Sequence, residues 1–180
     1  MTPLLAQLEI RPNAGANFSY FNEDIEENDF SGRVGYNLGV DLLIGDRFYL
    51  APGVHFFVTN NRVDVLEVGN VVEAEVEFQV KGFRIPVVAG AKLIQSDAFT
   101  LRLYGGGALS TLIDREDDLA NLQDLVLENN VWNVTAGLGF DFGQLVTVDL
   151  KHDWGVSDLF AIDGVKSRQN VIYLTAGIRL

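Results

Sequence analysis

The stretch Val131–Phe142 reads VWNVTAGLGFDF, and from Trp132 onward it alternates strictly between two kinds of residue. Successive residues of a β-strand point to opposite sides, so this period of two predicts a strand with two distinct faces. One face is wholly apolar, whereas the other carries glycine, polar or charged residues, as expected of a strand that separates two different surroundings. The apolar face comprises Trp132, Val134, Ala136, Leu138, Phe140 and Phe142, and the other comprises Asn133, Thr135, Gly137, Gly139 and Asp141.

Seven further segments alternate in the same way, so the sequence predicts eight strands. Arg33–Leu42 is the clearest of them, because every even position in it is apolar. Glu73–Leu93 is long and changes phase beside Lys81 and Gly82, and a slip of one residue next to glycine predicts a β-bulge. The remaining segments are Leu8–Tyr20, Phe48–Val58, Phe99–Ser110, Val146–Trp154 and Asn170–Leu180.

The connections between these segments alternate between short and long. The short turns are Gly45–Arg47, Gln95–Asp97 and Gly143–Gln144, and the long links are Asn22–Phe30, the region around Leu66–Val72, Asp114–Asn130 and Gly155–Arg168. An up-and-down barrel collects its short turns at one end and its long loops at the other, as outer-membrane barrels do. The third long link has apolar residues at helical spacing, which predicts a short helix there; they are Leu119, Leu122, Leu125 and Val126.

Composition narrows the class of protein. The 180 residues suit one domain, 1–180, and 48% are hydrophobic, with a mean hydropathy of +0.15 despite 25 acidic residues. No run approaches the roughly 18 to 20 apolar residues of a membrane helix, so strands of a closed barrel are the remaining way to cross lipid. The net charge of −12 argues against nucleic acid as a partner, and the absence of cysteine excludes disulfides and thiolate sites. Because no basic-then-apolar leader precedes Thr2, we expect a mature form whose secretory signal has been removed.

The character of the non-apolar face decides which side is inside. A soluble barrel of the lipocalin type has similar length and alternation, with its apolar face inside. Here the non-apolar face is rich in glycine, which suits a narrow interior, and aromatic residues fall near strand ends on the apolar face, where a membrane-interface girdle belongs. We therefore expect an apolar exterior in the lipid of a bacterial outer membrane, and keep the soluble barrel as an alternative. The girdle candidates are Tyr20, Tyr36, Phe48, Phe142 and Trp154.

Charges of both signs also fall on the face assigned to the interior. Eight strands enclose a space only just wide enough for side chains. Long charged side chains in such a space should pair, because an unpaired buried charge is costly. We therefore predict an interior charge network of Arg11, Arg33, Asp41, Arg84, Arg102, Asp141, Asp149, Lys151 and Arg179, with Glu9, Lys92 and Asp153 on the same face.

The sequence offers no catalytic residue, cofactor site or metal site. His55 is expected to face the interior and His152 the lipid, so the two histidines do not converge, and no serine has the Gly-x-Ser-x-Gly context of a hydrolase. Gly105–Gly107 lacks the Lys-Ser/Thr of a phosphate loop, and we interpret it as space for interior side chains. Acidic residues crowd two long links without EF-hand spacing, which favours solvated loops over the alternative of divalent-cation binding; they are Glu23, Asp24, Glu26, Glu27 and Asp29, and Asp114, Glu116, Asp117 and Asp118.

Several strands resemble a known family. NAGANFSYF at Asn13–Phe21, FYLAPGVHFF at Phe48–Phe57 and FRIPVVAGAKL at Phe83–Leu93 are similar to successive strands of the PorT-like outer-membrane β-barrel proteins of Bacteroidetes. The closing third of the chain, GLGFDFGQLVTVDLKHDWGVSDLF followed by VIYLTAGIRL, resembles the last three strands of that family. Leu180 departs from the pattern, since an aromatic residue is more usual at the end. The resemblance implies an outer-membrane location and, for some members, a role in secretion, with no catalytic residues.

These observations lead to an expected function. We expect a small integral outer-membrane barrel with a structural, envelope or partner-docking role, and not an enzyme. Its partners would be outer-membrane lipid and another envelope protein, and it would carry no cofactor. The alternatives are a narrow channel or small-ligand carrier in the outer membrane and, third, a soluble lipocalin-like binder.

Overall fold

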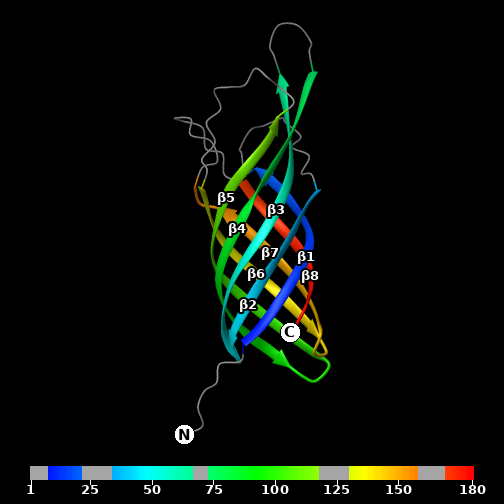
Figure 1. Cartoon of the computed structure of the whole chain (residues 1–180), viewed down its shortest axis with the longest axis vertical. Helices are drawn as coiled ribbons and strands as arrows, with labels where there is room; N and C mark the ends of the chain where they lie inside the picture. Colours follow the sequence, from blue (N-terminus) through cyan, green and yellow to red (C-terminus); the bar gives the residue numbers. More distant parts are fainter. Residues whose placement is uncertain (1–7, 22–33, 67–72, 118–129, 158–168) are drawn as a thin grey trace.

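The computed structural model describes residues 8–21, 34–66, 73–117, 130–157 and 169–180, and these form eight strands. Each strand pairs antiparallel with its neighbours in sequence, and β1 pairs with β8, so the sheet closes into a barrel (Figure 1). The predicted eight-stranded up-and-down barrel is therefore confirmed. The strands are β1 (Leu8–Phe21), β2 (Val34–Gly45), β3 (Phe48–Leu66), β4 (Glu73–Gln95), β5 (Phe99–Asp117), β6 (Asn130–Phe142), β7 (Val146–Gly155) and β8 (Gln169–Ile178).

The barrel closes through backbone pairing along the whole seam between its first and last strands. Asn13 lies opposite Gly177 at one end of this seam, and Phe21 lies opposite Gln169 at the other. Beyond β8, the N–H of Ile10 donates to the carbonyl of Leu180 at 3.0 Å, and the N–H of Leu180 donates to the carbonyl of Ile10 at 2.9 Å. Closure matters in lipid because no water is present there to satisfy a free sheet edge.

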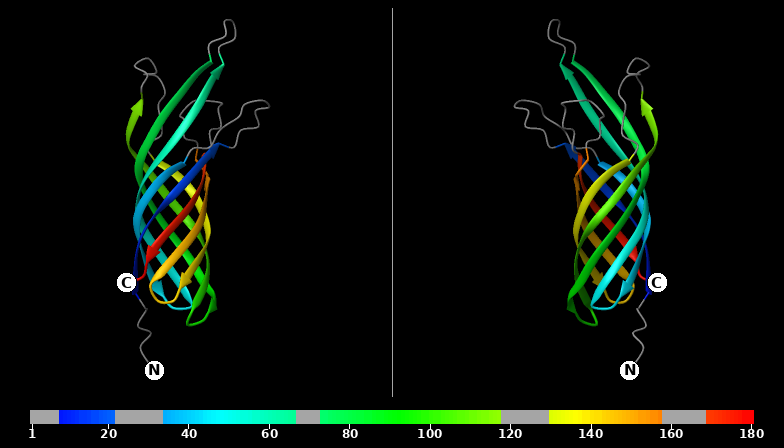
Figure 2. Two further views of the ribbon diagram at one scale, coloured as in Figure 1. Left: turned by 90° about the vertical axis from the view of Figure 1, so that its right-hand side faces the viewer. Right: turned by 90° about the vertical axis from the view of Figure 1, so that its left-hand side faces the viewer.

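The short turns gather at one end of the barrel, and β1 begins and β8 ends near that end (Figure 1). Two of these turns use glycine with a positive φ, 133° at Gly45 and 58° at Gly143, a region that other L-residues rarely adopt. At the opposite end β3 and β4 extend well beyond the ring of strands as a long hairpin (Figure 2). β5 continues to Asp117, so Asp114–Asp117, expected to open a long link, belong to a strand.

Two register irregularities occur between β4 and β5. Lys81 lies opposite Asp114 and Gly82 opposite Leu112, so a bulge occurs at the predicted point, but the extra residue is Ile113 of β5. β4 itself does not slip, because its register with β3 continues unshifted from Phe83 to Val80 and Val80 is buried in the lumen as Arg84 is. The interpretation of the phase change in Glu73–Leu93 as a slip of that strand is therefore wrong. A second shift follows Lys92, where Leu93 of β4 is the extra residue, and the sequence did not predict it. Bulges of this kind increase local twist and help a sheet to close.

The side chains have opposite surroundings on the two faces, as predicted. Asn17 and Asp141 face inward and are fully buried, whereas Leu138 and Trp132 face outward with exposed fractions of 37% and 59%. The soluble lipocalin alternative is therefore wrong, because it requires the apolar side chains inside. The predicted girdle residues are all exposed, and they lie toward the two ends of the wall: Phe48 and Phe142 at the end with short turns, and Tyr20, Tyr36 and Trp154 at the other.

One part of the sequence interpretation needs correction. Gly105–Gly107 was expected to leave space for interior side chains, but only Gly106 shares its face with inward Val88 and Thr135. Gly105 and Gly107 face the outside, because neighbouring residues of a strand alternate.

The predicted helix in the third long link and the acidic residues Glu23–Asp29 lie outside the described residues. No helix of the described ranges is long and apolar enough to cross a membrane.

Candidate functional site: the charge network of the lumen

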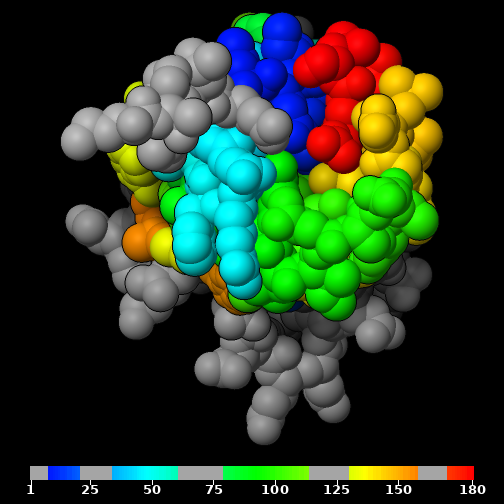
Figure 3. All heavy atoms as spheres, turned by 90° about the horizontal axis from the view of Figure 1, so that it is seen from below, coloured from blue at the N-terminus to red at the C-terminus, as the bar shows by residue number. Residues whose placement is uncertain are grey.

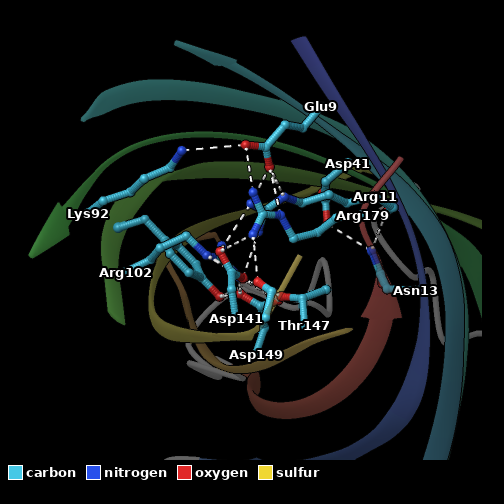
Figure 4. A network of polar contacts seen from close by, with 12 residues as sticks. Glu9, Arg11, Asn13, Asp41, Lys92, Arg102, Asp141, Thr147, Asp149 and Arg179 are labelled. Carbon is cyan, nitrogen blue, oxygen red and sulfur yellow. Dashed lines mark hydrogen bonds and ion pairs between the residues drawn. The ribbon is translucent and has the colours of Figure 1, made fainter. Parts of the chain in front are cut away.

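The most connected carboxylate of the lumen is Asp141 on β6, whose side chain is fully buried (Figure 4). Arg11 of β1 donates to it at 3.0 Å, and Arg102 of β5 donates to the same oxygen at 3.0 Å. The hydroxyl of Thr147 adds a third hydrogen bond at 2.9 Å. Charge-assisted hydrogen bonds from two guanidinium groups compensate the cost of removing this carboxylate from water.

Glu9 of β1 forms a second centre nearer the end with the short turns. It accepts hydrogen bonds from Arg11 and from Arg179, the latter at 3.1 Å, and Lys92 of β4 lies 3.4 Å away. Arg179 also approaches Asp141 to 3.9 Å. Glu9 and Asp141 thus share their cationic partners, so the two centres form one network across the lumen (Figure 4).

Asp149 of β7 extends this network along the wall. It contacts the Arg102 guanidinium at 3.1 Å and accepts a hydrogen bond from the Tyr104 hydroxyl at 3.0 Å. Arg102 therefore bridges Asp141 and Asp149, which belong to different strands. The tyrosine was not among the predicted network residues, although its place in the alternation of β5 already assigned it to the inner face.

Arg84 of β4 and Asp153 of β7 form a separate pair, farther from the end with the short turns than Glu9 and Asp141 are. Two hydrogen bonds of 2.6 Å and 2.7 Å join them, and their side chains are only 3% and 2% exposed. Thr135 donates to Asp153 at 2.7 Å and accepts from Arg84 at 2.9 Å. The Tyr173 ring lies 5.1 Å from the guanidinium carbon, within the range of a cation–π contact.

Asp41 of β2 is contacted by side chains of three other strands, β3, β1 and β7. His55 lies 2.8 Å from one oxygen, Asn13 donates to the other at 2.9 Å, and the Lys151 ammonium is 3.4 Å from that second oxygen. His152, by contrast, faces outward and contacts the Tyr20 hydroxyl at 2.7 Å. The two histidines therefore lie on opposite sides of the wall.

All predicted network residues that the structure describes lie in these contacts. Arg33 lies outside the described residues. Three residues that the sequence placed on the same face, Glu9, Lys92 and Asp153, complete the ion pairs. The pairing partners could not be read from the sequence, whereas the inward orientation of hydroxyls and amides such as Thr147 and Asn13 follows from their alternation. The network residues are Glu9, Arg11, Asp41, Arg84, Lys92, Arg102, Asp141, Asp149, Lys151, Asp153 and Arg179.

Two cavities that the described residues border inside the barrel are small. One cavity of about 30 Å³ is bordered by Tyr49, Arg102 and Lys151 among others. A second cavity of about 10 Å³ lies beside His55, Arg84 and Lys151. Since a water molecule needs about 10–15 Å³ on this measure, these spaces hold at most a few waters. Seen from the end with the short turns, the coloured atoms that no grey atoms cover lie against one another without a visible opening (Figure 3).

The arrangement has few features of a reaction centre. Within the described part of the chain no group of three histidine, aspartate or glutamate side chains could hold a metal ion. The buried acids are paired with cations, and the one contact between an inward histidine and an acid, His55 with Asp41, has no hydroxyl nucleophile in its hydrogen bonds. The geometry instead joins strands that lie far apart in sequence.

Comparison with known proteins identifies the same architecture. A family model described as "Outer membrane protein beta-barrel domain" matches residues 5–161. Ail of Yersinia pestis is 15% identical with a TM-score of 0.57, over 97% of this chain and 99% of that one. OprG of Pseudomonas aeruginosa is also 15% identical with a TM-score of 0.57, over 97% and 96%. Neisserial surface protein A is 10% identical with a TM-score of 0.54, over 96% and 97%. The search of curated proteins found no match.

Proposed function

Since this chain belongs to the outer membrane protein beta-barrel domain family and lies in a bacterial outer membrane, we propose that it is a sealed anchor that presents a docking surface to another envelope component. In this proposal residues 1–180 form a single domain. Its wall has a structural role in the outer membrane, and its long-link end carries the surface that recognises a partner. The observation that carries the proposal is the set of ion pairs that fills the lumen.

The lumen network supports a sealed barrel over a narrow channel. An ion crossing the barrel would have to separate pairs such as Arg84 with Asp153, which are held at 2.6 Å in a medium of low polarity. Separating a buried pair leaves two uncompensated charges, and removal of even one partner typically costs about 3–5 kcal/mol. A small-ligand carrier is disfavoured by volume, because the larger cavity measures only about 30 Å³.

A more specific form of the proposal follows from the resemblance to the PorT-like proteins of Bacteroidetes. The strands at Asn13–Phe21, Phe48–Phe57 and Phe83–Leu93 support it, and Leu180 departs from it. In that form the docking partner belongs to a secretion system of the envelope. The coarser proposal of a docking barrel does not depend on this assignment.

Sulfated polysaccharides are not the partner that we propose. Ail was crystallised with the heparin analogue sucrose octasulfate. In this chain the segment between β1 and β2 carries five acidic residues and a single arginine, Arg33. Negative charge on a protein repels a polyanion and attracts a cationic partner.

Two measurements test the proposal. Purified protein in planar lipid bilayers should give no stable single-channel steps, and Arg102→Ala should lower the thermal stability without producing an ion-selective pore. Reproducible ion-selective openings from the pure wild-type monomer would instead establish the channel alternative. Co-purification from native membranes in mild detergent should recover an envelope protein in a fixed ratio; recovery of the barrel alone under crosslinking conditions would contradict a docking role.

A further inference from the structure

The lumen contains more basic than acidic side chains among the residues that the structure describes. An unbalanced charge is costly in an interior of low polarity, because little solvent is present to compensate it. One further anion in the lumen would remove this imbalance. The six lysine and arginine side chains are Arg11, Arg84, Lys92, Arg102, Lys151 and Arg179, and the five carboxylates are those of Glu9, Asp41, Asp141, Asp149 and Asp153.

The excess of positive charge lies beside Arg102. The register places Lys92 of β4 directly opposite Arg102 of β5, and both side chains are buried. Like charges at opposed positions destabilise a sheet. The Lys92 ammonium contacts the carboxylate of Glu9 at 3.4 Å, but Arg11 and Arg179 also pair with that carboxylate (Figure 4). Glu9 alone therefore does not neutralise the cations that surround it.

The larger of the two cavities described above lies against Arg102. Its volume is about 30 Å³, and cations outnumber carboxylates along its border. The carboxylates there already have partners, because Asp149 accepts from Arg102 and Tyr104, and Asp41 accepts from Asn13. The cations at the border are Arg11, Arg84, Arg102 and Lys151, and the carboxylates are Asp41 and Asp149.

Two hydrogen-bond donors at the border of this cavity have unused capacity. Tyr49 is 5% exposed, and its buried hydroxyl has no hydrogen-bond partner among the described residues. The Lys151 ammonium carries three N–H donors, and it contacts Asp41 at the long distance of 3.4 Å. A buried donor without an acceptor destabilises a fold, whereas an anion accepts hydrogen bonds from several donors at once.

We propose that this cavity binds one chloride ion between the Tyr49 hydroxyl, the Lys151 ammonium and the Arg102 guanidinium. The ion gives the described lumen equal numbers of positive and negative charges. Size selects the ligand, because a water molecule needs about 10–15 Å³ on this measure, so the space admits a halide and one water but excludes phosphate and organic carboxylates. That water can donate to the carbonyl oxygen of Asn13, which borders the cavity and is also unpartnered. This site is independent of the docking role proposed above.

The test refolds the urea-unfolded full chain into lipid vesicles in sodium chloride or in sodium gluconate of equal ionic strength. The Tm, followed by the folded band on unboiled gels, should rise with chloride and saturate, by about 2–4 °C once chloride exceeds its Kd about fivefold. Bromide should act like chloride, and crystals grown in bromide should show an anomalous-scattering peak beside Tyr49. The same Tm in chloride and gluconate at every concentration would mean that the cavity holds water alone and would overturn the proposal.

Variants separate this site from a general effect of salt. Tyr49→Phe removes one donor and should raise the apparent Kd for chloride by about tenfold or more, because a hydrogen bond to a charged group is lost. Tyr20→Phe removes a hydroxyl on the outer wall, where Tyr20 contacts His152, and should leave the chloride dependence unchanged. Lys92→Met removes the excess cation without touching the cavity border and should also weaken the dependence. Unchanged chloride dependence in Tyr49→Phe would contradict the location of the site, and unchanged dependence in Lys92→Met would contradict the charge balance.

Discussion

Replacing Arg84 with methionine should destabilise the barrel more than most single substitutions. Methionine keeps the length of the side chain but removes the two hydrogen bonds of 2.6 Å and 2.7 Å to Asp153. The carboxylate of Asp153 is 2% exposed and would retain only the hydroxyl of Thr135, at 2.7 Å. Removing one partner of a buried ion pair leaves an uncompensated charge, so we expect a loss of about 3–5 kcal/mol in the free energy of unfolding.

The measurement is a denaturant titration of the protein refolded in lipid vesicles, followed by tryptophan fluorescence and by the folded band on unboiled gels. Arg47→Met is the matched control, because Arg47 lies exposed in the turn between β2 and β3. An exposed substitution of this kind should change the free energy of unfolding by less than about 0.5 kcal/mol.

A double variant tests the physical reason. Arg84→Met combined with Asp153→Leu removes both charges and leaves an apolar filling, and such replacements are often nearly neutral. The double variant should therefore be more stable than Arg84→Met alone. A cost below about 1 kcal/mol for Arg84→Met, or a double variant that loses the sum of both single costs, would refute the reasoning.

The remaining predictions concern the wall and one long link. Leu138→Arg should lower the free energy of unfolding in bilayers by about 2–4 kcal/mol if the residue lies near the midplane. A variant that folds normally in lipid, and that also refolds in water without detergent, would contradict the assignment of faces. Gly106→Ala should destabilise by about 1–3 kcal/mol, because its methyl group would lie 2.2 Å from the carbonyl oxygen of Val87. Gly107→Ala should be neutral or stabilising in the same titration, because the nearest atom would lie 3.8 Å away; equal losses for the two glycines would contradict the packing. Deleting residues 118–125 should preserve the heat-modifiable folded band, since such links contribute little to sheet pairing, and loss of that band would place the segment in the wall.

The faces of the wall were predictable from the sequence because β-strand alternation is a local property. Each residue of Trp132–Phe142 is assigned to a side by its position alone, independently of any other strand. Glycine, mixed charge and terminal aromatic residues then decide which side meets lipid. A bulge near Gly82 was predicted from a phase change in the segment that forms β4, but the extra residue is Ile113 of β5, so the position was predictable and the bulged strand was not.

The partners of the ion pairs across the lumen could be identified only from the tertiary structure. Arg11 reaches Asp141 over 130 residues of chain, and Arg84 reaches Asp153 over 69. Alternation assigns all four side chains to the lumen. Their height along the barrel axis depends on the register of each strand against its neighbour, and these offsets add up around the closed sheet. Their partners therefore follow only from closure. The second bulge, after Lys92, shifts that register by one residue without a signal in the hydrophobic pattern.

The phase change in Glu73–Leu93 combines both kinds of information. The sequence alone shows that the apolar residues change phase beside Gly82. Only the tertiary structure shows that β4 does not slip there, because its register with β3 continues unshifted from Phe83 to Val80 and Val80 is buried in the lumen as Arg84 is. The physical reason is that alternation is a local property of one strand, whereas a bulge exists only in the register between two paired strands.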